Sequence, residues 1–524
     1  MATSKESTRN KKSEYQDPLF ELIKSMSATE KRYFIVRAEK IRNIDGNIPD
    51  YYILFQLLVK REFFNEKEVA QELLKKVGKK SFSNFTVKKN ELYDALMKRL
   101  KSYHFNKSKK SADYIKVLLQ DSNFLFKRGL YQQANKKIRA ARKMAEKCGD
   151  TLSLIEMNRL EREFLRTNRV VKMEKRLEEL HQEEKKLIKD LTVEAERNKD
   201  YDNLLAKLLT KNRLTNKKDV EQLKSEYNHL ENFLDGKDLP IQAERFLLSS
   251  LISYYYLLGN NEQADSLMKL VFQWWKNNNL WKEKMPHYYI SALSNVLSTY
   301  NREKNYSEFL KTLEILEKFD INTQHEKTLR FYFLMHQRLM YYLNSGLINE
   351  ACSLSKRIEK GLKVNNLSEA NHIMLINNVV IAHFLNSNFL ECIRWIKFYK
   401  PFKKMARGKL KIQFSQILKL IAYYELGDMN NFDKTYGATL RYLSGIMNVD
   451  PLDFDMVMLS QIYKLNNALP KEQKYILKEI RDYLQSFSNQ YKRVGREELF
   501  FWVNSKLENK SMKNLLLEQI KNSP

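Results

Sequence analysis

The stretch FKRGLYQQANKKIRAARKMAEKCGD, residues 126–150, decides the fold. Gly129 ends an apolar helical run, Tyr131 follows two residues later, and Ala134 follows five residues later. Glycine adopts the left-handed conformation that ends a helix more readily than a residue with a Cβ atom. A small alanine where two helices cross lets their backbones approach. The stretch therefore predicts a tight hairpin of two helices.

The same pattern recurs along the chain, with substitutions at some positions. Successive helix stops from residue 259 to residue 427 are spaced by 45, 42, 41 and 40 residues, which gives a period of about 42. Further turns are expected near residues 166–169, 211–216, 467 and 509. The period predicts an all-α fold, a right-handed α-solenoid of about ten antiparallel helix pairs behind an N-terminal helical cap. The stops and the residues five positions later are Gly129 and Ala134, Gly259 and Ala264, Lys304 and Phe309, Gly346 and Ala351, Ser387 and Cys392, and Gly427 and Phe432.

Composition supports a helical, folded chain without enzyme chemistry. Apolar residues make up 43% of the 524 residues, enough for a large core, whereas 13 Gly and 8 Pro are too few for many strands and hairpins. The three cysteines are scattered, and no metal-ligand spacing, phosphate loop or nucleophile motif occurs. We expect no enzyme activity, no cofactor and no metal. The absence of a signal peptide or a long apolar segment predicts a cytoplasmic protein without membrane insertion.

The glycine, the aromatic residue two positions later and the alanine five positions later resemble the tetratricopeptide repeat, roughly over residues 110–520. That family's unit is about 34 residues, whereas this period of about 42 is nearer the HEAT and armadillo range. About eight extra residues are two helical turns, which leave the buried face unchanged. The stretch DPLFELIKSMSATEKRYF, residues 17–34, also resembles the start of uncharacterised repeat proteins from Bacteroidetes. The resemblance implies a degenerate, long-helix repeat array and no particular activity.

Three regions are expected along the chain. Residues 1–16 are expected to be a disordered tail, residues 17–108 an N-terminal helical domain, and residues 109–523 the repeat array. A capping box at Ser27 to Glu30 begins one helix, and Asn65 can cap another. The short helix and the longer basic helix over residues 83–104 are compatible with a helix-turn-helix as well as with a terminal cap.

Positive charge marks the strongest candidate site. Lys and Arg number 92 against 64 Asp and Glu, a net charge of +28, which favours acidic partners but is also compatible with biased composition on solvated helix faces. Arg139 and Arg142 are expected on one such solvated face. Residues 394–411 form a basic patch without an acidic residue, in which the interleaved aromatic residues are expected to be mostly buried. Its basic residues are Arg394, Lys397, Lys400, Lys403, Lys404, Arg407, Lys409 and Lys411.

The expected function is that of a helical-repeat scaffold. Stacked helix pairs form an extended concave surface, lined by the first helix of each pair, that suits a protein or peptide partner. The alternative is a nucleic-acid-associated regulator that uses the N-terminal helices or residues 394–411. The polar residues expected to contact the partner on the concave face are His336, Arg338, Asn377, Asn378 and Gln416.

Overall fold

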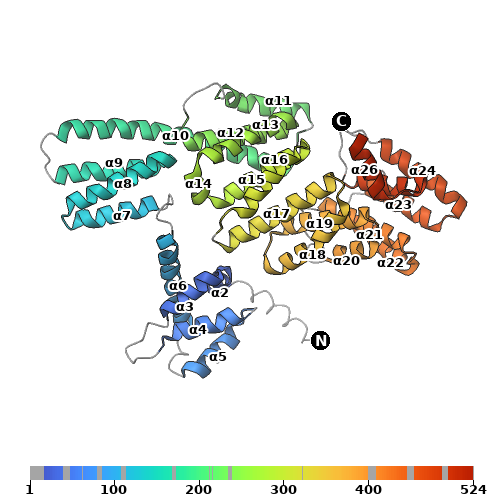
Figure 1. Ribbon diagram of the computed structural model, residues 1–524, viewed down its shortest axis with the longest axis horizontal. Coiled ribbons are helices and arrows are strands. Elements are labelled where there is room, and N and C mark those ends of the chain that lie inside the picture. Colours follow the sequence, from blue (N-terminus) through green and yellow to red (C-terminus); the bar gives the residue numbers. More distant parts are fainter. Residues whose placement is uncertain are drawn as a thin grey trace. The chain divides into compact units, whose positions relative to one another are not determined.

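Helices account for the regular structure of the chain. Within the part that the computed structural model describes, the chain forms 25 α-helices and no strand, which confirms the all-α prediction (Figure 1). The expected disordered tail, residues 1–16, lies outside that part. The structure describes residues 17–38, 48–61, 63–78, 85–107, 114–167, 173–211, 213–214, 216–233, 239–321, 323–398, 409–444, 454–486 and 494–522.

The chain divides into two compact units, each described here by itself. Unit 1 contains Met1–Ala292 and Ile321–Glu326, and unit 2 contains Leu293–Asp320 and Lys327–Pro524. The helices α15 (Pro286–Arg302) and α17 (Gln324–Asn344) each belong partly to both units. The remaining elements of unit 1 are α2 (Pro18–Ser25), α3 (Ala28–Ala38), α4 (Asp50–Lys60), α5 (Glu66–Val77), α6 (Phe85–Lys107), α7 (Tyr114–Lys127), α8 (Tyr131–Cys148), α9 (Thr151–Thr167), α10 (Met173–Lys211), α11 (Lys217–Tyr227), the 3-10 helix η2 (Asn228–Phe233), α12 (Ile241–Leu258), α13 (Asn261–Asn277) and α14 (Asn279–Lys284).

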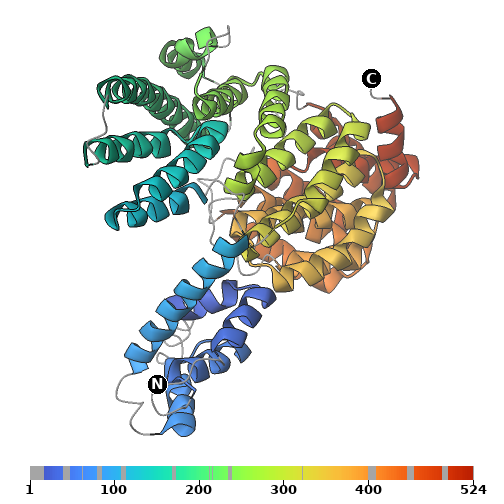
Figure 2. The same ribbon diagram turned by 60° about the vertical axis from the view of Figure 1, so that its left-hand side comes forward.

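From α18 to α26, consecutive helices of unit 2 pack side by side, and the yellow-to-orange part of Figures 1 and 2 shows the first of them. In addition, α19 contacts α21, and α21 contacts α23, so the first helices of successive pairs also lie side by side. The remaining elements of unit 2 are α16 (Tyr306–Lys318), α18 (Ile348–Val364), α19 (Glu369–Leu385), α20 (Phe389–Ile396), α21 (Lys409–Glu425), α22 (Met429–Ser444), α23 (Phe454–Asn467), α24 (Pro470–Ser486), α25 (Arg496–Glu508) and α26 (Met512–Asn522).

The predicted helix stops share one backbone geometry. All six stop residues, including the non-glycine residues Lys304 (φ 55°) and Ser387 (φ 56°), adopt the left-handed conformation. After each stop, the next amide donates to the carbonyl five residues earlier, for example Leu130 N to Leu125 O at 3.0 Å. This bond is that of a Schellman motif, which satisfies carbonyls left free at the helix end. The turn predicted near residue 509 has the same bond.

The residue five positions after each stop is buried. Ala134, Ala264 and Ala351 have no exposed surface, and neither do Phe309, Cys392 and Phe432 at the equivalent positions. Each of these positions therefore belongs to the core. The sequence pattern thus locates the turn and a buried position in the helix that follows it.

The regular series of helix pairs is interrupted at α10. Turns near residues 166–169 and 211–216 are compatible with the structure, because α9 ends at Thr167, α10 ends at Lys211 and α11 begins at Lys217. A full period between these turns would hold two helices, but α10 is a single helix of 39 residues. The stretch from Met173 to Lys211 contains neither Gly nor Pro, so nothing in the sequence ends this helix earlier.

The helices α2 to α6 share a hydrophobic core cluster that runs from Leu19 to Leu96. The predicted capping box is present, since Ser27 N donates to Glu30 Oε2 at 2.6 Å and Glu30 N donates to Ser27 Oγ at 3.3 Å. Asn65 caps α5 through Glu68 N as predicted. Lys89 of α6 forms an ion pair with Asp17, so its charge is used within this cluster.

Near its C-terminus the chain returns to earlier helices of unit 2. α25 contacts α19, and Trp502 of α25 donates from Nε1 to Glu425 Oε1 of α21 at 2.7 Å. A Cβ atom at Gly346 would lie 2.5 Å from the Leu517 side chain of α26, so α26 packs closely on the turn after α17. α25 and α26 therefore pack against α17, α19 and α21, first helices that were expected to line the concave surface.

Candidate functional site

An open pocket of about 720 Å³ lies where α25 and α26 pack against α17 and α19. Its volume is within the usual range for ligand sites, about 300 to 1,000 Å³. We call it the unit 2 pocket. Its wall combines seven apolar side chains with four amide side chains and three charged residues. The lining residues are Met340, Leu343, Asn344, Asn377, Asn378, Ile381, Leu385, Val494, Gly495, Arg496, Glu497, Glu498, Phe501, Leu516 and Gln519.

Two predicted contact residues, Asn377 and Asn378, line the unit 2 pocket from α19. Asn378 donates from Nδ2 to Met340 Sδ at 3.3 Å, and the same atom lies 3.3 Å from His336 Nδ1. Asn377 is only 5% exposed, yet its side chain forms no hydrogen bond within the described chain. A buried amide without a partner is unfavourable unless water or a ligand satisfies it.

His336 lies within hydrogen-bonding distance of Asn378, and Lys411 is close enough to His336 to affect its charge. Burial, together with the positive charge of Lys411, lowers the pKa of His336 to about 4. Burial also lowers the pKa of Lys411 to about 8, and its ammonium group contacts Met374 Sδ. His336 is therefore neutral at physiological pH, which suits its Nδ1 to accept the hydrogen bond from Asn378.

Glu498 of α25 contributes a carboxyl group to the pocket, and this group accepts a hydrogen bond from its own backbone N–H. This half-buried carboxyl group of α25 forms no ion pair within the described chain. Burial raises its pKa to about 7, and the negative charge of Glu497 contributes to the increase. The neighbouring Arg496 donates from Nε to Leu484 O at 2.8 Å. The pocket therefore holds a carboxyl group whose charged form lacks a counter-ion among the described residues.

The charge of Glu498 makes the stability of unit 2 depend on pH. Between the ordinary pKa of 4.5 and about 7, the folded state holds a proton that the unfolded state releases, so stability falls as pH rises. Replacing Glu498 with Gln removes this dependence. We expect Glu498→Gln to gain about 2 kcal/mol relative to the wild type from pH 4.5 to pH 7, allowing for solvent screening. Hydrogen exchange of unit 2 peptides across this range measures the difference, and an offset independent of pH would contradict it. Glu508→Gln, an exposed change on the same helix, is the control.

The other predicted contact residues lie elsewhere. Arg338 forms an ion pair with Glu317 at 2.6 Å. Gln416 lines a separate pocket of about 70 Å³ together with Tyr442. The structure therefore brings His336, Asn377 and Asn378 together and does not add Arg338 or Gln416 to them.

Only part of the predicted basic patch lies within the described residues. Arg394 forms ion pairs with Glu391 at 2.8 Å and Glu359 at 3.0 Å, and Lys411 is half-buried. Lys397 is exposed. Lys400, Lys403, Lys404 and Arg407 lie outside the described residues, and the side chain of Lys409 is not described.

The aromatic residues of the patch include a core residue, as expected. Trp395 is completely buried and stacks on Phe398, with 5.0 Å between the ring centroids. Tyr399 and Phe402 lie outside the described residues. Trp395 is therefore not available to stack on a nucleic-acid base.

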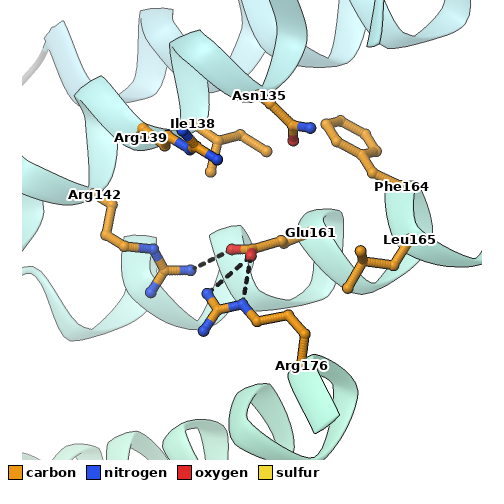
Figure 3. Close-up of a pocket in the computed structure, with 8 residues that line it drawn as sticks. All are labelled: Asn135, Ile138, Arg139, Arg142, Glu161, Phe164, Leu165 and Arg176. Atoms are coloured by element: carbon orange, nitrogen blue, oxygen red, sulfur yellow. Dashed lines mark hydrogen bonds and ion pairs between the residues drawn. The ribbon is translucent and has the colours of Figure 1, made fainter. Parts of the chain in front are cut away.

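A second pocket, of about 380 Å³, lies among α8, α9 and α10 of unit 1 (Figure 3). Arg142 and Arg176 point at the carboxylate of Glu161 from two sides, at 3.0 Å and 2.8 Å. Arg142 also pairs with Glu183 at 2.7 Å. Arg142 is thus half-buried in an ion-pair network, so the expectation of a solvated position is wrong for this residue. Arg139 is exposed as expected.

The network in Figure 3 predicts unequal effects for two neighbouring arginines. Arg142→Met removes a cation that three acceptors share and leaves Glu183 without its ion pair. We expect a loss of about 2 kcal/mol in the stability of unit 1, measured by hydrogen exchange of peptides from α8 to α10. Arg139→Met, at an exposed position without a partner in the described chain, should change stability by less than about 0.5 kcal/mol. Equal losses in the two variants would contradict a stabilising role for the network.

Several pocket residues were not identified from the sequence. Glu497 and Glu498 resemble ordinary acidic residues in the first turn of a helix, and Phe501 resembles an ordinary core residue. Their position in the pocket depends on the return of α25 to α19. The absence of a basic residue three or four positions after Glu498 is the only local sign that its charge is unpaired.

The described part of the chain contains no helix long and apolar enough to cross a membrane. Within the same residues, no group of three or more His, Cys, Asp or Glu side chains is placed to hold a metal ion. No family model, curated protein or solved structure matches the chain.

Proposed function

We propose that the chain is a helical-repeat scaffold of the tetratricopeptide-like, long-helix kind, which acts in the cytoplasm and binds a protein or peptide partner through the unit 2 pocket. The observation that carries the proposal is the unit 2 pocket itself, which combines apolar side chains with the amide of Asn377 and the carboxyl group of Glu498, neither of which has a side-chain partner within the described chain. Ligand sites in proteins combine an apolar wall with a few convergent polar groups in this way.

The repeated turn supports the proposed solenoid. The same left-handed residue, the same Schellman bond and the same buried small or apolar residue recur with a period of about 42 residues. Each helix pair on its own leaves an apolar face exposed, and stacking successive pairs buries it. We propose that the pairs continue this arrangement over most of the chain, with an interruption at α10.

A peptide fits the pocket better than a nucleic acid does. Amide side chains carry both a donor and an acceptor, which match the N–H and C=O groups of an extended backbone. Nucleic-acid binding needs several free cations along the phosphate backbone. Among the described residues of the basic patch, Arg394 is paired and Lys411 is half-buried, so only Lys397 is available.

Affinity capture from the native cell with a pocket-filling variant tests the proposal. Ile381→Trp adds a large ring to the pocket wall, and Leu390→Trp adds the same ring at a 69% exposed position of α20. We expect a stoichiometric protein partner that survives nuclease treatment, is retained by Leu390→Trp and is lost with Ile381→Trp. Equal capture by both variants, or loss of all bound material on nuclease treatment, would overturn the proposal.

A further inference from the structure

We propose that the unit 2 pocket recognises a basic side chain, lysine or arginine, on an extended peptide, with the cation paired to Glu498 and the peptide backbone bonded to Asn377. The inference rests on the proposed function and adds the chemistry of the partner. It is unexpected for a chain with a net charge of +28, which by itself favours acidic partners.

The first argument is the charge of the pocket. Its three charged lining residues are Arg496, Glu497 and Glu498, so the local charge is negative within a positive chain. Arg496 is already engaged with the Leu484 carbonyl. Glu498 faces the pocket without a cation, and a half-buried carboxylate is stabilised strongly by an opposite charge at hydrogen-bonding distance. A bound cation supplies a charge that the described residues around Glu498 do not.

The second argument is the amide of Asn377, which is independent of the charge. This side chain is 95% removed from solvent, lines the pocket and has no hydrogen-bond partner within the described chain. The adjacent Asn378 is held by His336 and Met340, so the two amides are not equivalent. Asn377, whose amide has no partner in the described chain, is therefore suited to form a hydrogen bond with a backbone group of a ligand.

The third argument is the size of the site. About 720 Å³ is much larger than an ammonium or guanidinium group, and the wall includes Leu343, Ile381, Leu385 and Phe501. Such a wall packs against the aliphatic stem of a lysine or arginine and against a neighbouring apolar side chain. The site therefore fits a basic side chain carried by a peptide better than a free amine.

The charged groups around Glu498 allow a pH dependence of binding. The lining residues from α17, α19 and α26 are uncharged, and α25 itself contributes Arg496 and Glu497. His336 of α17 lies within hydrogen-bonding distance of Asn378, Lys411 of α21 is close to His336, and burial keeps His336 neutral. Because Glu498 is the group that gains charge as pH rises toward 8, affinity for a cation should increase over that range.

The test is selection of short random peptides on the full-length chain, followed by binding titrations of the selected peptides. We expect lysine or arginine enriched next to apolar residues, binding about tenfold weaker with Glu498→Gln, and unchanged binding with Glu508→Gln, the exposed change on the same helix. Asn377→Ala should also weaken binding, and acetylation of a selected lysine should have the effect of Glu498→Gln. For the wild type, affinity should rise between about pH 6 and about pH 8, and this rise should vanish in Glu498→Gln.

The outcomes separate this inference from the proposed function. Peptides that bind the wild type, fail with Ile381→Trp and show no basic residue, or bind Glu498→Gln equally well, would overturn the cation inference and leave the peptide-binding function supported. If no selected peptide depends on the pocket, with binding equal for the wild type and Ile381→Trp, both are overturned. Circular dichroism of each variant establishes that its helices are intact.

Discussion

Gly495→Ala is expected to destabilise unit 2 by about 3 to 4 kcal/mol and to abolish peptide binding at the unit 2 pocket. Gly495 is the residue before α25, has φ of +88° and lines the pocket. A left-handed conformation costs a residue with a Cβ atom about 1 to 2 kcal/mol. The added Cβ would also lie 2.0 Å from Cε2 of Phe414, a buried ring of α21.

The clash with Phe414 accounts for most of the extra loss of stability expected at Gly495, compared with a turn glycine that has open space around it. Phe414 is a core residue and cannot move without disturbing its neighbours, so the start of α25 has to move instead. This movement displaces Glu498, which is three residues along the same helix. Loss of stability and loss of binding should therefore appear together.

Gly427→Ala is the matched control. Gly427 also has a left-handed conformation, with φ of +66°, but a Cβ atom there meets nothing within 4 Å. We expect a loss of about 1 kcal/mol from the backbone conformation alone and unchanged peptide binding. Hydrogen exchange of unit 2 peptides measures both variants. Similar losses for Gly495→Ala and Gly427→Ala would show that Phe414 does not restrict the position of α25.

The local features of this fold could be predicted from the sequence because each depends on a few neighbouring residues. The stops at Lys304 and Ser387 are informative, since neither is glycine, yet both adopt the left-handed conformation that the spacing requires. The capping box at Ser27 and the cap at Asn65 are equally local. In each case the residues that decide the geometry lie within about six positions of one another.

The prediction was weaker where a regular period was extended across a region that does not repeat. The 39 residues of α10 contain no helix-ending residue, and this local signal was outweighed by the assumption of a constant period. The sequence places Arg142 on a solvated face because it lies opposite Ile138 and Ala141. Its partners Glu161 and Glu183, however, lie in other helices. Helical periodicity identifies the apolar face of α8 but does not show which polar residues meet a charged neighbour.

The pocket itself depends on long-range packing that no local pattern reports. Trp502 meets Glu425 across 77 residues, and this contact helps to hold α25 against α21. Asn377 and Asn378 were selected as the polar minority of an apolar helix, which is a local signal. Glu498, their counterpart across the pocket, has the sequence surroundings of an ordinary surface residue. One side of the site was therefore predictable, and the other was not.

The second large effect on stability is expected at two buried tryptophans of unit 2, Trp395 and Trp502. Their phenylalanine variants should lose different amounts of stability. Trp395 and Trp502 are both completely buried, so replacing either with Ala should cost about 4 kcal/mol through lost packing and an internal cavity. Trp502 Nε1 donates to Glu425 Oε1, whereas Trp395 Nε1 meets no acceptor in the described chain. Trp502→Phe leaves Glu425 without this donor and should cost about 2 kcal/mol.

Trp395→Phe should be milder, because the smaller ring removes a buried donor that has no acceptor. We expect a loss of about 1 kcal/mol or less, since relief of the unpaired N–H offsets part of the lost volume. Hydrogen exchange of unit 2 peptides compares the four variants, and circular dichroism checks that each remains helical. Equal losses for the two phenylalanine variants would contradict the role of the Glu425 bond. Because this bond joins α25 to α21, Trp502→Phe should also weaken peptide binding at the unit 2 pocket, whereas Trp395→Phe should not.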